Sequence, residues 1–322
     1  MRRAAVGVMA TMMWVALLPG LARAGYVFTD QTPTTPVLTG AYQRYPTLLG
    51  DGTTLELWYE NRTTSNIEMR TSTTGYAGFG SAAATSGLAG LGHPRIYGGG
   101  SGGGGYVGFF WDSVQSPPSG IKRLTSSDGV SWGVSTDVSI AGSPGTSSIW
   151  GVCGYFEDVS GTTDVLYYTQ GTGGVEHVHR ATATDGIHFT HQGTAFQNPG
   201  GNYGAGVSVG SQVVYDANNG DYMLIWCAEA ITHHIGYAAS IDGGLTFSNQ
   251  GTVVLDSAGH TDLEETAFVL NGAQLVGLYT GDFAGDSSNH IGAYTGEYTV
   301  PEPGLLGLLA AGWFGLLRKR RG

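Results

Sequence analysis

Short apolar segments rich in aromatic and β-branched residues recur along the middle of the chain. Examples are LELWYE at 55–60, YVGFFWD at 106–112 and YMLIWCAE at 222–229, and turns rich in Gly, Asn and Asp separate them. This pattern predicts β-strands. Asn-Gly and Asp-Gly pairs favour tight turns between strands because these residues tolerate positive φ. The 55 glycines argue against long helices, in which each glycine costs about 1 kcal/mol relative to alanine.

One segment recurs five times. IEMRTSTTGYAGFG begins at Ile67, and related segments begin at Ile121, His177, Ile235 and Ile291, at spacings of 54, 56, 58 and 56 residues. A complete unit contains a strand, a turn, an aromatic strand, a third strand, a tight turn that is Asp-Gly in three of the repeats, and a short fourth strand. Repeated antiparallel four-stranded units are typical of radially packed blades. The sequence therefore predicts an all-β fold, a five-bladed β-propeller spanning residues 25–299.

The fifth unit ends early, at Pro301, without an Asp-Gly turn or a fourth strand. The edge of its third strand would be left exposed, and exposed edges are normally covered. We expect the N-terminal segment to close the ring, with Tyr26–Phe28 or Pro36–Leu38 pairing with Ile291–Tyr294.

Three of the repeats contain the related turns TSSDGVSW, TATDGIHF and ASIDGGLTF. Their aspartates, Asp128, Asp185 and Asp242, are predicted to build the turns by accepting backbone N–H bonds, not to catalyse. The turns resemble the Asp-box of sialidase-like propellers. The whole repeat is similar to the five-bladed propellers of glycoside hydrolase families 43, 32 and 130, and this resemblance implies a glycan-handling ancestry. The turn aromatics are expected to fill the space between strands: Trp132, Phe189 and Phe247.

Polar side chains gather where second strands end and innermost strands begin, on the face opposite the Asp-Gly turns. Aromatic rings beside carboxylates suit a sugar, which offers apolar C–H faces and hydroxyl groups. We therefore predict one shared glycan-binding mouth. Its candidate ligand-binding residues are Arg44, Glu60, His93, Arg95, Trp150, Tyr203, Glu229, Asp262 and Asp282.

Glycoside hydrolysis needs two carboxyl groups across the scissile bond. The candidate general acid is Glu264 or Glu265, of which strand alternation would point only one inward, and the candidate partner is Asp112, with Glu60 and Glu229 as alternatives. The resemblance implies catalytic carboxylates near the starts of innermost strands. Because Arg44, His93 and Trp150 stand there instead, no catalytic residue is transferred from the family. Three functions stay open: a glycan-binding propeller, an active hydrolase, and a structural or interaction propeller of the envelope or extracellular matrix.

Both ends of the chain look like targeting signals. Residues 1–24 form an expected signal peptide with cleavage by signal peptidase after Ala24. Residues 300–322 resemble a PEP-CTERM sorting signal, with Pro301, Glu302 and Pro303 followed by a short apolar transmembrane helix and a basic cluster. This resemblance implies export by a Gram-negative bacterium that makes extracellular polysaccharide. It also implies transient anchoring, then cleavage by an exosortase-type protease, with the protein ending at the outer surface or outside the cell. An ordinary tail anchor is the alternative.

The chain between these ends is acidic. Seven of the 14 Lys and Arg residues lie in the first 24 or the last five residues, whereas all 25 acidic residues lie between them, so that part has a net charge of 7 − 25 = −18. This charge argues against nucleic acid as a partner. Cys153 and Cys227 could pair in an exported protein or could be buried thiols. The histidines and the DANNGD turn are expected to be packing or turn residues, so no metal or cofactor is predicted, and calcium at that turn has no further support.

Overall fold

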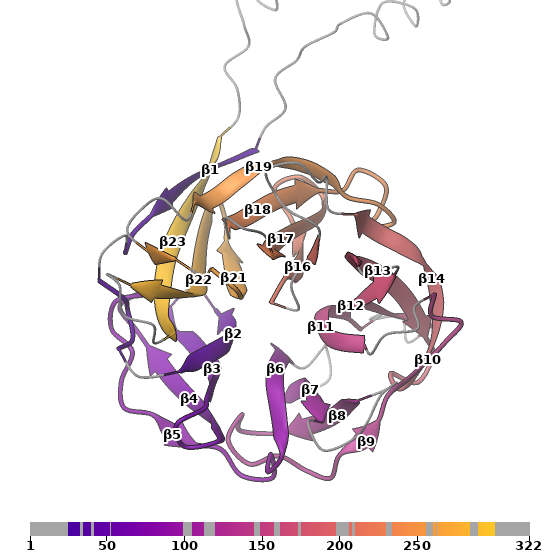
Figure 1. Cartoon of the computed structure of the whole chain (residues 1–322), viewed down its shortest axis with the longest axis horizontal. Helices are drawn as coiled ribbons and strands as arrows, with labels where there is room; N and C mark the ends of the chain where they lie inside the picture. The colour runs from indigo at the N-terminus through magenta and orange to yellow at the C-terminus, as the bar shows by residue number, and fades with distance from the viewer. Residues whose placement is uncertain are drawn as a thin grey trace, which may run out of the picture. The chain divides into compact units, whose positions relative to one another are not determined.

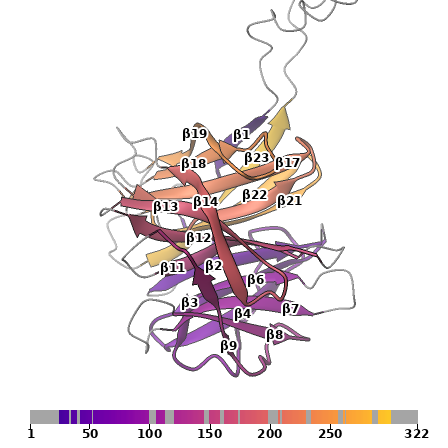
Figure 2. The same cartoon turned by 90° about the vertical axis from the view of Figure 1, so that its right-hand side faces the viewer.

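The computed structural model describes residues 25–32, 35–39, 42–51, 53–98, 105–112, 120–144, 149–157, 162–172, 175–197, 206–207, 210–229, 234–255, 260–261, 263–283 and 289–299. Within Phe28–Glu297, which form one compact unit, five sheets surround a central axis (Figure 1). The predicted five-bladed β-propeller is confirmed. Viewed from the side, neighbouring strands of each blade run alongside one another (Figure 2).

Each blade has its innermost strand at the axis. Blade 1 contains β2 (Gln43–Gly50), β3 (Leu55–Asn61), β4 (Asn66–Ser72) and β5 (Ala83–Ala84), and blade 2 contains β6 (Leu91–Gly98), β7 (Tyr106–Asp112), β8 (Ile121–Ser126) and β9 (Thr136–Asp137). Blade 3 contains β11 (Ile149–Phe156), β12 (Asp164–Thr172), β13 (Val175–Ala183) and β14 (His188–Gln197), with β10 (Ser139–Ala141) parallel to β14.

The last two blades follow the same order. Blade 4 contains β16 (Gln212–Asp216), β17 (Asp221–Glu229), β18 (His234–Ala239) and β19 (Ser248–Leu255), with β15 (Gly206–Val207) on β17. Blade 5 contains β21 (Thr266–Asn271), β22 (Gln274–Phe283) and β23 (Asn289–Thr299), with β20 (His260–Thr261) on β22 and β1 (Gly25–Asp30) at the outer edge.

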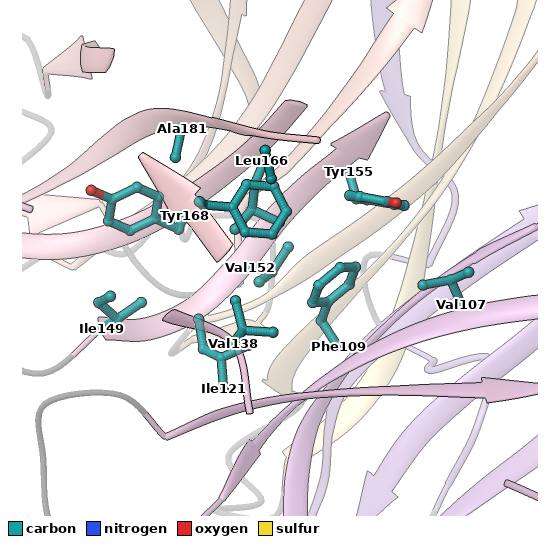
Figure 3. Close-up of a cluster of buried hydrophobic side chains, with 12 residues drawn as sticks. Val107, Phe109, Ile121, Val138, Ile149, Val152, Tyr155, Leu166, Tyr168 and Ala181 are labelled. Carbon is teal, nitrogen blue, oxygen red and sulfur yellow. The ribbon is translucent and has the colours of Figure 1, made fainter. Parts of the chain in front are cut away.

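Apolar side chains fill the spaces between blades. In Figure 3, Phe109 of blade 2 lies beside Val152 and Tyr155 of blade 3, and the rings of Phe109 and Tyr155 are 4.9 Å apart. Related clusters lie between blades 1 and 2, 3 and 4, and 5 and 1. Burial of apolar surface at each junction, worth about 25 cal/mol per Å², therefore holds neighbouring sheets together.

The N-terminal segment closes the ring, as predicted. The Val37 N–H donates to the Ile291 carbonyl at 2.7 Å, and the Ile291 N–H donates to the Leu38 carbonyl at 3.3 Å. Gln31 N–H donates to the carbonyl of Ala293 at 2.9 Å. The edge of β23 is thus covered both along β1 and at Val37–Leu38. Gly25–Val27 and Tyr298–Thr299 group with the chain ends as a second unit, in which the rings of Tyr26 and Tyr298 lie 5.4 Å apart.

The Asp-Gly turns have the predicted structure. Asp128 Oδ1 accepts the N–H groups of Val130 and Ser131 at 2.9 and 2.7 Å, and Gly129 has φ of +72°. Asp185 and Asp242 accept backbone N–H groups in the same way. The turn aromatics are buried as expected: Trp132, Phe189 and Phe247.

Cys153 and Cys227 form no disulfide and are both buried, so the open question of their pairing is answered in favour of buried thiols. Burial raises the pKa of the Cys153 thiol to about 12. The predicted signal peptide and PEP-CTERM segment lie outside the described residues. Within the described ranges, no helix is long and apolar enough to cross a membrane.

Candidate functional site

The described residues that were predicted to form the mouth lie mainly where inner strands begin and second strands end. In blade 1 the inner-strand residue Arg44 faces Glu60, the second-strand residue opposite it, and in blade 2 Leu91 faces Asp112 in the same way. We call this region, with Arg44, Tyr45, His93 and the Glu264–Glu265 pair, the Arg44 mouth.

Two adjacent carboxylates converge on one guanidinium group. Arg44 Nη2 lies 2.8 Å from Glu265 Oε1 and also forms an ion pair with Glu264. The Glu265 side chain is 1% exposed and that of Glu264 is 24% exposed. Of the two glutamates only Glu265 is buried, and burial alternates over Leu263, Glu264 and Glu265 just before β21 begins at Thr266. Both carboxylates nevertheless contact Arg44.

Two opposing influences act on the pKa of the Glu265 carboxyl. Burial raises the pKa of the Glu265 carboxyl, whereas the positive charge of Arg44 opposes this rise. The ion pair therefore stabilises a carboxylate that would otherwise tend to take up a proton.

Three aromatic rings form a ladder at the same mouth. The rings of Tyr45 and His93 stack with centroids 3.6 Å apart, and those of His93 and Trp111 stack at 5.0 Å. Two guanidinium carbons, of Arg44 and Arg62, lie 5.2 and 5.7 Å from the Tyr45 centroid. Trp111 and Arg62 were not among the predicted site residues. Their position next to Asp112 and Glu60, at the ends of second strands, was the signal that could have identified them.

The stacked residues Tyr45 and His93 have strained backbone conformations. Tyr45 and His93 have φ values of 54° and 48°, which are unusual for residues other than glycine and are further disfavoured before proline. Each lies in a β-bulge, between Arg44 and Thr47 or between Gly92 and Arg95. Such strain costs about 1–3 kcal/mol per residue and tends to occur at functional sites. Here the two matched bulges redirect two aromatic side chains toward each other.

Glu60 and Asp112 are engaged by neighbouring groups. Glu60 Oε1 accepts from Arg62 Nε at 2.9 Å, and its Oε2 accepts from the His93 N–H at 3.3 Å. Asp112 lies 3.5 Å from Lys122 Nζ, and Lys122 also pairs with Asp137. The structure thus joins Glu60 to the aromatic ladder and holds Asp112 against the third strand of its own blade.

Arg95 lies below the mouth, in the centre of the ring. It is 4% exposed, and its guanidinium donates to the carbonyl oxygens of Pro46 and, at 3.5 Å, Ser211. These acceptors belong to the starts of blades 1 and 4. Arg95 therefore connects blades across the axis from inside the protein.

The remaining predicted residues are only partly described. Trp150 and Glu229 have backbones in β11 and β17, but their side chains are outside the description, as are Tyr203 and Asp262 entirely. Asp282 lies near the end of β22, opposite Thr261 and Asn289. Among the described residues, no cluster of three or more His, Cys, Asp or Glu side chains could hold a metal ion.

Comparisons with known proteins identify the fold. No protein-family model matches the sequence, and no curated protein matches it. Solved structures do. The catalytic domain of a GH62 α-L-arabinofuranosidase from Coprinopsis cinerea aligns over 85% of this chain and 97% of its own, with 12% identity and a TM-score of 0.62.

Two further glycoside hydrolase families share the fold. A thermostable family-43 glycoside hydrolase aligns over 84% of this chain and 94% of its own, with 15% identity and a TM-score of 0.62. A GH130 structure, from a family described as containing hydrolases of β-1,2-mannosidic linkages in Candida mannan, aligns over 86% and 95% with 15% identity and a TM-score of 0.57. The chain is thus a five-bladed propeller similar in structure to families 43, 62 and 130.

Proposed function

We propose that this chain is an exported β-propeller that binds a glycan at the Arg44 mouth without cleaving it. The observation that carries the proposal is the Tyr45–His93–Trp111 ladder beside polar and charged groups. Tyr45 is 7% exposed and His93 stacks between the other two rings, so the partly exposed Trp111 is the ring that offers a flat apolar surface for sugar C–H groups. The surrounding carboxylates and guanidinium groups can bond sugar hydroxyls. Structures of this fold with xylotriose and with cellotriose support a saccharide as the ligand class.

The state of the acids favours binding over hydrolysis. Hydrolysis requires one carboxylic acid that can donate a proton and a second carboxylate acting on the sugar. The four described candidates, Glu60, Asp112, Glu264 and Glu265, each contact a cationic side chain. A pair of acids held in this way is poorly suited to act across a glycosidic bond.

A hydrolase remains the second candidate function, because burial raises the pKa of Glu265 and Glu264 is partly exposed beside it. A raised pKa is what a general acid needs near neutral pH. The two functions predict different results with the same variants.

The test combines binding and turnover. Wild-type protein is titrated with arabino-, xylo-, cello- and manno-oligosaccharides and sialosides, and release of reducing sugar is measured in parallel. We expect one ligand class to bind without turnover, and Trp111→Ala to weaken that binding about tenfold through lost stacking. The matched control is Leu245→Ala, which removes an exposed apolar side chain (54% exposed) in the Asp-Gly turn of blade 4.

Turnover by wild type that disappears in Glu264→Gln or Glu265→Gln would establish the hydrolase instead. If no saccharide binds and none is cleaved, the glycan proposal fails and the structural or interaction propeller becomes the better account.

We also propose that the chain is exported and sorted through its two ends. The support is sequence alone: the A-x-A site at Ala22–Ala24 and the three-part tail from Pro301 to Arg321. Mass spectrometry of the mature protein from its host tests this. We expect an N-terminus at Gly25 and a C-terminus near Glu302, and recovery of an intact 305–322 tail rules out processing.

A further inference from the structure

A second cavity lies at the opposite end of the inner strands. It has a volume of about 530 Å³ and is lined by residues where inner strands end, including Leu49–Asp51 after β2, Gly98 at the end of β6 and Leu270 of β21. The lining side chains come from all five blades. We call it the Tyr97 cavity, and its principal side chains are Glu56, Tyr97, Tyr106, Tyr155, Phe156 and Tyr215.

The Tyr97 cavity is separate from the Arg44 mouth. Arg95 and Tyr97 lie two residues apart on β6, so their side chains are on the same face of the strand, and Arg95 is the one nearer the Arg44 mouth. Its buried guanidinium donates to carbonyls of blades 1 and 4 and lies between the two openings. A ligand in the Tyr97 cavity would therefore not reach the Tyr45–His93–Trp111 ladder.

The lining is aromatic and negatively charged. The described residues that line the cavity include Asp51 and Glu56 but no Lys, Arg or His. Backbone N–H groups of Thr54 and Thr53 and the hydroxyl of Thr53 hold the pKa of the Asp51 carboxyl down to about 2, so it is ionised at neutral pH. Both oxygens of Glu56 lie 3.0 Å from the Tyr106 hydroxyl, which can donate to only one of them and leaves acceptor capacity on the carboxylate.

A polar atom in this cavity is left without a protein partner. The Tyr97 hydroxyl is buried, and no described residue forms a hydrogen bond with it. Its burial raises the pKa of the phenol, so it stays neutral and can both accept and donate a hydrogen bond. A buried group of this kind normally has a partner, which points to a ligand or water at this position.

We propose that the Tyr97 cavity binds a small organic cation bearing an ammonium group. An ammonium is attracted to aromatic rings and to carboxylates, and both are present here. The nearest described cations, Arg95 beside Tyr97 and Arg123 at the Tyr155 hydroxyl, do not line the cavity. The Glu56 carboxylate would face the charge, the tyrosine and phenylalanine rings would surround its methyl or methylene groups, and the Tyr97 hydroxyl would accept an N–H bond where the ammonium carries one. This site goes beyond the glycan proposal, since it uses another opening and ligands of another chemistry.

The charge is tested with a pair of probes of equal shape. Purified full-length protein is titrated by NMR or calorimetry with choline and with its uncharged isostere 3,3-dimethylbutan-1-ol. We expect choline to bind about tenfold more tightly than the isostere, in the range of a cation–aromatic interaction. Higher salt should weaken choline binding and leave the isostere unaffected.

Variants locate the site. Glu56→Gln keeps the shape of the side chain and its bond to Tyr106 but removes the charge, and should weaken choline binding at least about fivefold. Tyr97→Phe should weaken ethanolamine, which has N–H donors, and leave choline unchanged. Trp111→Ala, at the other mouth, is the matched control and should not alter binding of either amine. Thermal unfolding confirms that each variant is folded. If Glu56→Gln is not, Asp51→Asn, which removes the other negative charge of the lining, replaces it and should likewise weaken choline binding.

Equal affinity for choline and its isostere overturns the proposal, as does binding that survives Glu56→Gln. Binding of a neutral disaccharide here in place of choline, lost in Tyr97→Phe, would reassign the cavity to sugars. Absence of any binding at tens of millimolar overturns it as well. Each result is independent of the glycan test, because that test depends on Trp111 and not on Glu56.

Discussion

Arg44 forms ion pairs with two adjacent acids, Glu264 and Glu265. Its partner Glu265 lies 221 residues away in the sequence and is almost wholly buried. Removing one member of a buried ion pair leaves the other charge uncompensated, which costs more than the pair itself contributes.

We therefore expect Arg44→Met to lower the free energy of unfolding by about 3–5 kcal/mol at pH 7, measured by urea denaturation. Arg44 is the strongest of the groups that oppose the effect of burial on Glu265, so without it the pKa of this carboxyl rises further. A carboxyl with a raised folded-state pKa favours folding at low pH, so the loss should be smaller at pH 5. The double variant Arg44→Met with Glu265→Gln should recover part of the stability. A loss below about 1 kcal/mol would mean that the pair is solvated.

His179 is a second residue whose burial has a measurable consequence. Its side chain is 1% exposed, and burial lowers the pKa of the imidazole to about 4. Its Nδ1 and Nε2 lie 3.2 and 3.3 Å from Thr194 Oγ1 and the Gln170 carbonyl, next to the rings of His177 and His191.

The unfolded chain protonates this imidazole near pH 6.5, whereas the folded chain does so only near pH 4. The contribution to stability is therefore complete above about pH 6.5 and is lost as the pH falls toward 4, by up to about 3 kcal/mol. His179→Gln should flatten this part of the stability–pH curve, measured by denaturation at several pH values. His177→Gln, at a less buried position, should change it less. An unaltered curve in His179→Gln would show that His179 titrates normally.

At the scale of single elements, the paired bulges of β2 and β6 distinguish this propeller's mouth. Thr47 Oγ1 donates to the Pro94 carbonyl at 2.5 Å, and Arg95 donates to the Pro46 carbonyl. Each bulge thus has its proline carbonyl satisfied by a side chain from the other strand. This mutual support explains how two strained residues persist side by side, since a strained conformation is kept only when its surroundings stabilise it.

The N-terminal segment is the element that completes blade 5. Leu38 is 7% exposed in the cluster between blades 5 and 1, and its backbone pairs with Ile291. We expect Leu38→Ala to cost about 2–4 kcal/mol of stability, the usual range for removing a buried leucine side chain. Hydrogen exchange should show faster exchange of the Ile291 amide than in wild type.

The control for this prediction is Val134→Ala, which alters a side chain that is 93% exposed and should leave both stability and exchange unchanged. Unchanged protection of Ile291 in Leu38→Ala would show that β1 alone covers the edge of β23.

At the scale of the whole molecule, the centre of the ring is held by polar groups as well as apolar ones. Arg95 joins β6 to the starts of blades 1 and 4 through backbone carbonyls. Burial lowers the pKa of its guanidinium, which nevertheless stays protonated because an arginine titrates far above neutral pH.

Arg95→Met keeps most of the volume but leaves the Pro46 and Ser211 carbonyls without this donor. We expect a loss of about 2–4 kcal/mol, seen as a lower midpoint in urea. Arg95→Lys, which keeps the charge and one donor group, should lose less. If both variants are as stable as wild type, the centre of the ring does not depend on these bonds.

Much of the fold could be predicted because its signals are local. Each repeat carries its own alternating strands, and three of the five carry an Asp-Gly turn followed by an aromatic residue. The number of blades, the role of Asp128 and the covering of β23 therefore followed from short segments. The order of strands within each repeat also predicted that Glu60 and Asp112 lie at the ends of second strands, as they do in the structure.

Which side chains contact one another at the candidate site was decided only by the tertiary structure. The sequence could not show that Arg44 pairs with both Glu264 and Glu265, or that Arg95 turns inward to backbone carbonyls. It also could not show that two bulges bring Tyr45 onto His93, or that a second, acidic cavity lies behind them. The physical reason is the same in each case: ring closure brings residues more than 40 positions apart within hydrogen-bonding or stacking distance, and a local pattern carries no information about which of them meet.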